Sequence, residues 1–281
     1  MSAGIYVNDN GTWKLPKSVW VKNGTSTSGN TAWRVCKNVY VRSNGVWKEM
    51  MKTIDLTSSK NNFNLYEYVG SPTEPLSLIF NISSSVEISS SGNTGGYRTT
   101  AFTVGNFPSG STVIINNNGY ISGGGGDRGA ANRPGSYGKG GPGGNGGYGL
   151  VKGSNNNFDC TLVNTGTIAG GGGGGGAGGG YNASNGGAPG AYGGQGAGIT
   201  GFSKTQGEVG QAAQKGTLVI IGGPDITVYG GKGGDGGSNS QDGTSGEAGN
   251  QGGGVGGKGR AAILSSGIEI AVSGNIDGSI V

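Results

Sequence analysis

The first 51 residues repeat one pattern of apolar and polar positions. Each copy has a β-branched/aromatic/β-branched triplet, a turn that contains Asn-Gly or a similar pair, and a returning segment with Trp before a basic residue. The triplets start at Ile5, Val19 and Val39, and the returning pairs are Trp13-Lys14, Trp33-Arg34 and Trp47-Lys48. Asn-Gly between such segments is a strong β-hairpin signal. The pattern therefore predicts three hairpins, which must pack on each other or on a partner chain because a single hairpin is marginal in water.

Residues 52–118 alternate apolar and polar positions over short stretches. Strands are predicted at 63–69, 76–82 and 111–115, and prolines at 72, 75 and 108 separate them. This part is expected to be a β-rich domain.

Residues 119–281 alternate apolar strands with glycine tracts. The motif Gly-x-Ile-x-Gly recurs where a strand meets a tract, at 119–123, 166–170 and 274–278, and a further strand is predicted at Ile226–Tyr229. Such recurring units predict a stacked, repeat-like architecture. The chain is thus divided into a hairpin module (1–51), a β-rich domain (52–118) and a glycine-rich domain (119–281).

The glycines keep a three-residue phase. There are 69 glycines in 281 residues, and one series is Gly138, Gly141, Gly144 and Gly147. A polyproline II helix turns once in three residues, so such a series lines one edge and lets neighbouring backbones approach closely. The predicted fold class is mainly β and polyproline II, with a sandwich of glycine helices at the C-terminal end. Disorder is the competing interpretation, because only 32% of the residues are hydrophobic.

Composition argues against catalysis and bound cofactors. Histidine is absent, which removes the commonest general base and metal ligand. Cys36 and Cys160 lie in unlike segments and are expected to be buried free thiols, with no disulfide or metal site. No secretory signal or membrane span is predicted, and the net charge of +4 does not indicate nucleic-acid binding. No cofactor is expected.

The junction motif followed by Gly170–Gly176 resembles the glycine-rich receptor-binding adhesins at the distal tip of T-even long tail fibres. The resemblance covers roughly Ser111–Val281 and includes Val228–Gly237. It implies a sandwich of polyglycine II helices whose loops form the host-receptor surface, in a virion protein made and assembled in the host cytoplasm. The Trp-Lys hairpins are similar to segments found in phage tail proteins generally.

A non-enzymatic receptor-binding protein is therefore expected, with an outer-membrane protein or a polysaccharide as receptor. Residues 1–51 are expected to join it to other tail or fibre proteins or to its own copies, for which a homotrimer is the usual fibre symmetry. The alternatives are a purely structural virion protein, a glycine-rich ice-binding or matrix protein, and a tail-spike hydrolase. A hydrolase would need paired carboxylates at a cleft, and the 15 acidic residues show no obvious pair.

Four loops are candidates for the receptor surface: 127–137, 181–192, 200–215 and 238–250. The expected contacts are three tyrosines, which give large contact area at low entropy cost, and three basic residues that suit an anionic envelope. They are Tyr137, Tyr181, Tyr192, Arg128, Arg133 and Lys204. The alternative is that the tyrosines only cap the glycine helices. Since alternate connections of an up-and-down bundle lie at opposite ends, one set of loops is expected to be silent.

Overall fold

The structure of the 281-residue chain is a computed structural model. It describes the chain except for residues 1–6, 10–11, 15–18, 24–31, 37, 44–45, 91–99, 132–137, 155–156, 184–185, 189–190, 194–195, 199–202, 219–223, 265 and 273. For the strands within 7–50, and for residues 182–183, 186–188 and 218, it describes the backbone alone. The described part is mainly β, with parallel sheets and one four-residue helix, α1 (Leu65–Tyr68), which confirms the expectation of a β protein almost without helix.

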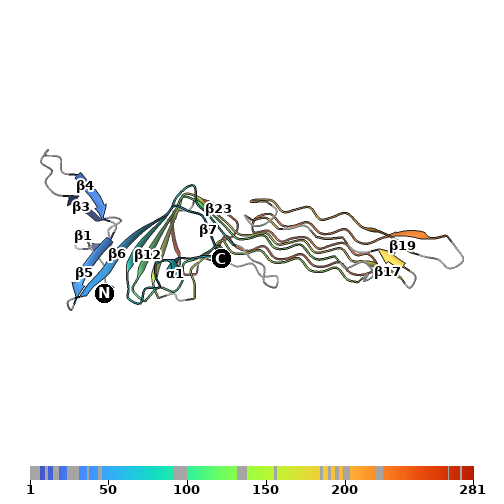
Figure 1. Ribbon diagram of the computed structural model, residues 1–281, viewed down its shortest axis with the longest axis horizontal. Helices are drawn as coiled ribbons and strands as arrows, with labels where there is room; N and C mark the ends of the chain where they lie inside the picture. Colours follow the sequence, from blue (N-terminus) through green and yellow to red (C-terminus); the bar gives the residue numbers. More distant parts are fainter. Residues whose placement is uncertain are drawn as a thin grey trace.

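Three sheets form the body of the molecule, and successive strands of the chain pass from one sheet to the next (Figure 1). The first sheet has the order β22 (Glu269–Val272), β15 (Asp159–Asn164), β12 (Thr112–Asn117), β9 (Ser77–Ile82), β6 (Val46–Leu56) and β5 (Asn38–Ser43). The second has the order β23 (Asn275–Asp277), β16 (Thr167–Ala169), β13 (Tyr120–Ser122), β10 (Glu87–Ser89) and β7 (Lys60–Asn61). The third has the order β21 (Ile263–Leu264), β14 (Leu150–Val151), β11 (Phe102–Thr103) and β8 (Phe63–Asn64). Apart from the antiparallel pair β5–β6, the pairing is parallel, so the body is a three-sided coil of stacked turns.

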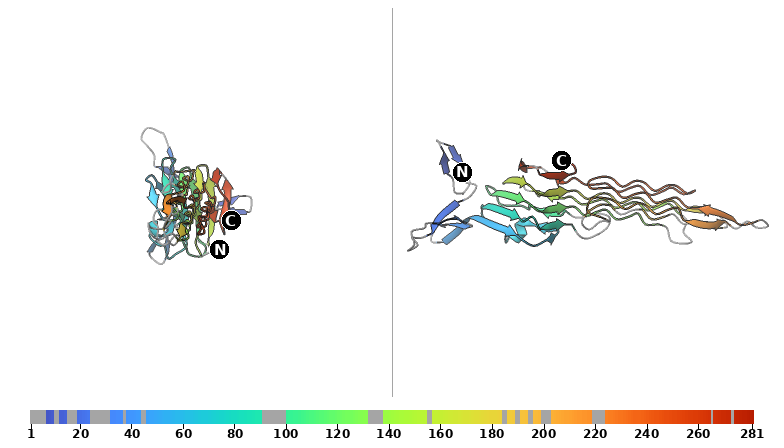
Figure 2. Two further views of the ribbon diagram at one scale, coloured as in Figure 1. Left: turned by 90° about the vertical axis from the view of Figure 1, so that its right-hand side faces the viewer. Right: turned by 90° about the horizontal axis from the view of Figure 1, so that it is seen from above.

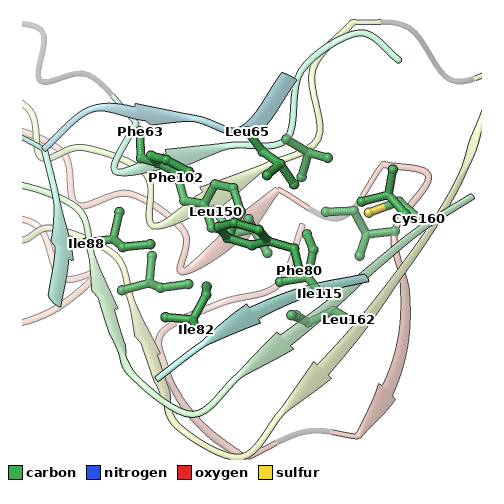
Figure 3. Close-up of a cluster of buried hydrophobic side chains, with 14 of the residues drawn as sticks. Phe63, Leu65, Phe80, Ile82, Ile88, Phe102, Ile115, Leu150, Cys160 and Leu162 are labelled. Carbon is green, nitrogen blue, oxygen red and sulfur yellow. The ribbon is translucent and has the colours of Figure 1, made fainter. Parts of the chain in front are cut away.

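Alternating apolar residues fill the inside of this coil. In β9 the residues Leu78, Phe80 and Ile82 are buried, and the intervening residues are only half-buried. The parallel register stacks like on like, so that Phe80 pairs with Ile115 of β12 and Phe102 pairs with Phe63 of β8. Figure 3 shows these side chains converging from all three sheets. The period-two pattern therefore packs as expected for a strand with one face in a core.

The Gly-x-Ile-x-Gly motif forms three of the five strands of the second sheet, namely β13, β16 and β23. Its isoleucines lie side by side, with Ile121 paired to Ile168 and Ile168 paired to Ile276. The preceding turn is stacked as well, because the buried Asn117 Nδ2 donates to Asn164 Oδ1 at 2.7 Å while Asn117 Oδ1 accepts from the Gly119 N–H at 3.0 Å. The predicted stacked repeat is confirmed, and each motif is one layer of it.

The prediction of a strand at 63–69 is correct for the first two residues and wrong for the rest. The chain forms β8 over Phe63–Asn64 and then the helix α1. The Asn64 side chain accepts from the Glu67 N–H at 3.4 Å and so caps the helix, which turns the chain at a corner of the coil. Leu65 is nevertheless fully buried, which explains why the alternation continued through the turn.

The three predicted N-terminal hairpins are confirmed. They are β1 (Val7–Asp9) with β2 (Thr12–Lys14), β3 (Val19–Asn23) with β4 (Ala32–Cys36), and β5 with β6. Only the third is continuous with the body, because β6 runs on from its hairpin and pairs with β9 over residues 51–56. The first two hairpins lie at one end of the molecule (Figure 1).

The glycine tracts are two excursions from the same corner of the coil. The first leaves after β13 and returns at β14, and the second leaves after β16 and returns at β21. They run side by side away from the body (Figure 2). The parallel sheets continue past residue 118 to the last strands of the chain, and the proposed division into three domains stays a prediction about units that fold or act by themselves.

Residues 170–180, the central tract, lie at the centre of the glycine bundle and are buried throughout. Backbone hydrogen bonds join the central tract to six others, which we call the ring: 123–131, 138–148, 191–193 continued by 196–198, 230–237, 241–249 and 251–260. The bonds recur at every third residue, so that Gly171, Gly174 and Ala177 donate in turn to one ring tract. The N–H groups serve three ring tracts and the carbonyls accept from the other three.

The ring is closed by bonds between its own neighbours. Six such bonds, one for each adjoining pair, are Gly144 N to Asp127 O (2.7 Å), Gly140 N to Gly252 O (2.9 Å), Gly243 N to Gly257 O (2.9 Å), Thr244 N to Asp235 O (2.8 Å), Ala191 N to Gly231 O (3.1 Å) and Gly196 N to Gly126 O (2.9 Å). A further tract, 206–214, lies outside the ring and accepts from Gly233 and Gly236. The backbone itself is therefore the core of this half of the molecule, and its hydrogen bonds replace apolar side-chain packing.

The aromatic core of the coil is expected to dominate the stability of the body. Phe80 is fully buried, with ring centroids 5.6 Å from Phe63 and 6.0 Å from Phe102. Phe80→Ala should therefore cost about 3–5 kcal/mol and lower the thermal midpoint of the full chain. Val209→Ala is the control, since that side chain is 70% exposed and should change stability by less than about 0.5 kcal/mol. Calorimetric midpoints that agree for the two variants would contradict this assignment of the core.

Candidate functional site

A four-stranded antiparallel sheet lies at the end of the glycine bundle farthest from the hairpins (Figures 1 and 2). Its order is β17 (Tyr181–Ala183), β18 (Gly186–Ala188), β19 (Lys215–Leu218) and β20 (Ile226–Tyr229), and we call it the tip sheet. Only Val228 of β20 is buried, while Ile226 is 47% exposed and Tyr229 is 58% exposed. Large apolar side chains thus stand open to solvent at the extremity of an elongated molecule.

Arg128 and Tyr192 come together on the ring. The Arg128 guanidinium carbon lies 5.9 Å from the centroid of the Tyr192 ring, and that ring is 41% exposed. The Tyr192 carbonyl accepts from the Gln211 N–H at 3.0 Å, which fixes the backbone beside the outer tract. A cation over an exposed aromatic ring presents both a charge and a flat apolar surface to a ligand.

The other predicted contacts are distributed differently. Tyr181 begins β17 of the tip sheet and is half-buried. Arg133 and Tyr137 lie outside the described residues. The sequence reasoning missed Ile226 and Tyr229 as candidates, although it predicted their strand. The available signal was that this strand lacks the isoleucine motif of the stacked layers and so has no place among them.

Lys204 lies at the opposite end of the bundle, against the body. Its ammonium group forms an ion pair with Glu87 of β10 and lies 5.4 Å from the centroid of Tyr120 of β13. The Tyr120 hydroxyl donates to the Lys204 carbonyl at 3.3 Å, and burial raises the pKa of Tyr120. This segment therefore ties the outer tract to the coil.

The 238–250 candidate also starts at the body. Asn239 Nδ2 donates to Asp277 Oδ2 at 3.0 Å, and the Ser240 hydroxyl donates to the Asp277 carbonyl at 3.2 Å. From there residues 241–249 run along the central tract as a member of the ring. Of the four candidate loops, 181–192 enters the tip sheet, and the described part of 127–137 lies midway along the bundle. The other two, 200–215 and 238–250, begin at the near end and run along the bundle toward the far end.

The described residues show no cluster of three or more Cys, Asp or Glu side chains that could hold a metal ion. Cys160 is buried beside Lys152, and burial raises the pKa of its thiol to about 12, so it is a protonated core residue. Cys36 belongs to β4, whose side chains lie outside the described atoms. Within the described part of the chain, no helix has the length and apolar character that a membrane crossing requires.

Comparison with known proteins shows the family and the function of the chain. The family described as phage tail fibre adhesin Gp38 matches residues 51–281. The chain belongs to this family. A solved structure, the gp37-gp38 adhesin tip complex of the bacteriophage S16 long tail fiber, resembles the adhesin with 23% sequence identity and a TM-score of 0.46, over 84% of each chain. A search of curated proteins gave no match.

The protein is therefore a tail fibre adhesin of the virion, which attaches the phage to its host. Membership of an adhesin family confirms the predicted receptor-binding function and its non-enzymatic character over the structural, ice-binding and hydrolase alternatives. Residues 1–50 lie outside the family match.

Proposed function

We propose that the adhesin binds its host receptor with the tip sheet and with the adjoining part of the ring that carries Arg128 and Tyr192. The observation that supports this most directly is the exposure of Ile226 and Tyr229 in the tip sheet, at the end of the bundle opposite the N-terminal hairpins, while Tyr192 is exposed on the ring between that end and the body. An apolar surface that is rimmed by polar groups is typical of a binding site. The receptor is an outer-membrane protein or a polysaccharide of the bacterial surface.

The glycine bundle is proposed to be a packed set of polyglycine II helices. In its support, hydrogen bonds leave the central tract at every third residue and reach six neighbours, as a helix with three residues per turn requires. At about 3.1 Å per residue, the eleven residues of the central tract span roughly 34 Å. Such a bundle would hold the tip at a fixed distance from the body.

Recognition is assigned to Arg128, Tyr181 and Tyr192, with Arg133 and Tyr137 from the neighbouring candidate loop. Tyrosine can stack on a sugar or pack on a protein loop, and arginine can meet an envelope phosphate or carboxylate. The near-end segments around Lys204 and 238–241 are proposed to make no contact with the receptor. Lys204 and Asn239 contact the body instead, which favours a structural role for these segments.

Adsorption of phage carrying substituted adhesin tests this proposal. Arg128→Ala with Tyr192→Ala is expected to lower the adsorption rate at least about tenfold, since the two side chains form one exposed cluster and interface clusters carry most of the binding energy. Thr205→Ala with Gln206→Ala, exposed at the near end, is the matched control and should adsorb normally. Normal adsorption of the Arg128/Tyr192 variant, together with an unchanged host range, would place the receptor site elsewhere.

Residues 1–51 are proposed to hold the adhesin on the fibre, either as a single copy or as a homotrimer. Support comes from the position of the first two hairpins at the end away from the tip. Each is a two-stranded sheet in the described residues, which is a marginal unit without a partner.

A further inference from the structure

The glycine bundle has a basic side and an acidic side. Two adjoining ring tracts, 138–148 and 251–260, carry Lys139, Lys258 and Arg260 and have no acidic residue in their sequence. The tract 241–249 and the outer tract 206–214 carry Asp242, Glu247 and Glu208 and have no basic residue. The sign of the charge separates by tract on these four tracts, whereas 123–131 and 230–237 each carry one acidic and one basic residue.

An arginine and a tyrosine contact each other on the basic side. Arg260 Nη1 donates to the Tyr148 hydroxyl at 3.3 Å, and the guanidinium carbon lies 5.3 Å from the centroid of the same ring. Both residues are half-buried. The tyrosine therefore restricts the guanidinium, whose fork of donors matches the oxygens of a phosphate.

Two lysines extend this side along the bundle. The Lys258 side chain is 71% exposed and its Nζ lies 2.7 Å from Asp242 Oδ2, on the adjoining tract. This hydrogen bond holds the pKa of Asp242 below its usual value. Lys139 is exposed, and its side chain lies beside Gly252, about six residues along the tract from Lys258. A six-residue separation corresponds to roughly 19 Å in a polyproline II helix, so the charges form a row.

We propose that this basic flank, made of Lys139, Tyr148, Lys258 and Arg260, binds phosphate groups of the host envelope, as an accessory site separate from the tip. The proposal rests on the adhesin function argued above. A row of cations suits a repeated anion, and a ring beside an arginine suits a phosphate carried on a sugar. The Lys258–Asp242 pair is exposed, so it costs little to open when a phosphate approaches.

A second copy of the chain is the competing occupant, because the acidic side of one bundle could meet the basic side of another. The phosphate ligand is favoured by the Arg260–Tyr148 pair, which places a guanidinium beside an aromatic ring and leaves the other guanidinium donors for phosphate oxygens. On the acidic side, Asp242 is already paired with Lys258 of the same chain, and Glu208 lies apart from it on the outer tract.

Binding of the purified full chain to lipopolysaccharide tests the flank. The probes are deep-rough lipopolysaccharide, the same material after chemical dephosphorylation, and phosphatidylcholine vesicles with and without phosphatidylglycerol. We expect binding to native lipopolysaccharide that weakens steeply with added salt and is lost on dephosphorylation. Lys139→Gln with Arg260→Gln should weaken it about 25-fold, from about fivefold for each basic residue at an anionic surface. Lys60→Gln with Lys232→Gln removes the same charge elsewhere and should bind normally.

The other possible results either support the phosphate-binding proposal or overturn it. Equal binding by the two double variants, or retention after dephosphorylation, would overturn the proposal. Equal binding to phosphatidylglycerol vesicles would support phosphate recognition but assign it to any phosphorylated lipid headgroup. Low-salt dimers in sedimentation that Lys139→Gln with Arg260→Gln abolishes, without lipopolysaccharide binding, would show an interface between copies and overturn the proposal. Failure of the tip would appear instead as normal adsorption of the Arg128/Tyr192 variant, and it leaves these measurements unaffected.

Discussion

Replacing Gly174 by alanine is expected to unfold the glycine bundle while it adds only one methyl group. Gly174 is in the central tract, and a Cβ at this position would overlap the carbonyl oxygen of Asp127 on a ring tract. The obstacle is backbone, which is itself bonded to further tracts, so the methyl group cannot be accommodated by a side-chain rotation. We expect a loss of more than about 4 kcal/mol, which is exceptional for a single substitution. Calorimetry of the full chain and the soluble yield would measure it.

Gly252→Ala is the matched control for this experiment. Gly252 lies on an outward position of the ring, and a Cβ there would come no closer than 3.7 Å to the Lys139 side chain. The same chemical change should therefore be neutral or stabilise by about 0.4–1 kcal/mol, because alanine restricts the unfolded chain. A thermal midpoint of Gly174→Ala that equals that of Gly252→Ala would mean that the bundle is not packed as described.

Ala177 shows how far the central tract tolerates a side chain. It is fully buried within an otherwise all-glycine segment, and Gly129, Gly141 and Gly254 face it from the ring. One methyl group is thus accepted at this position of the central tract, where the packing has formed around it. The tract is otherwise restricted to glycine because it has neighbours on six sides.

The phase of the glycines predicted this half of the molecule well, and the reason is physical. In the ring tract 138–148 a Cβ would meet central-tract backbone at Gly143 and the backbone of a neighbouring ring tract at Gly144, so only one residue in three is free to vary and the glycines keep phase. The central tract has no outward side, so its glycines are continuous and show no phase. The run Gly170–Gly176 was recognised as part of a family motif, but its place at the centre depends on six partners that are distant in sequence, which one segment cannot reveal.

The coil was predicted in its parts and less well in its connections. The alternation in β9 and the motif isoleucines Ile121 and Ile168 fixed the strands and their stacking. Both glycine excursions leave from one corner of the coil because strands that are tens of residues apart in sequence pair with each other. A local sequence pattern does not show which distant strands pair. The same limit hid the tip sheet, because β18 and β19 pair through a long intervening tract.

Removal of residues 1–37 is expected to release the adhesin from phage particles without unfolding it. The structure sets this boundary, since β5 covers the edge of β6, and β6 carries the buried Met51 into the first layer of the coil. A cut after residue 51 would remove part of that layer and confuse loss of attachment with loss of folding. The two hairpins that are removed make their described strand pairs only within themselves.

Immunoblots of purified particles would measure incorporation of the adhesin. Binding of the purified truncated protein to host cells would measure receptor binding by the tip. We expect the truncated adhesin to be absent from particles but to bind cells as the full chain does. The Arg128/Tyr192 variant is the reciprocal control and should be present on particles that adsorb poorly. These opposite outcomes separate the two ends of the molecule, because each change removes one contact and leaves the glycine bundle between them intact. Particles that retain the truncated protein would show that attachment resides in the coil, on a surface that residues 38–281 supply.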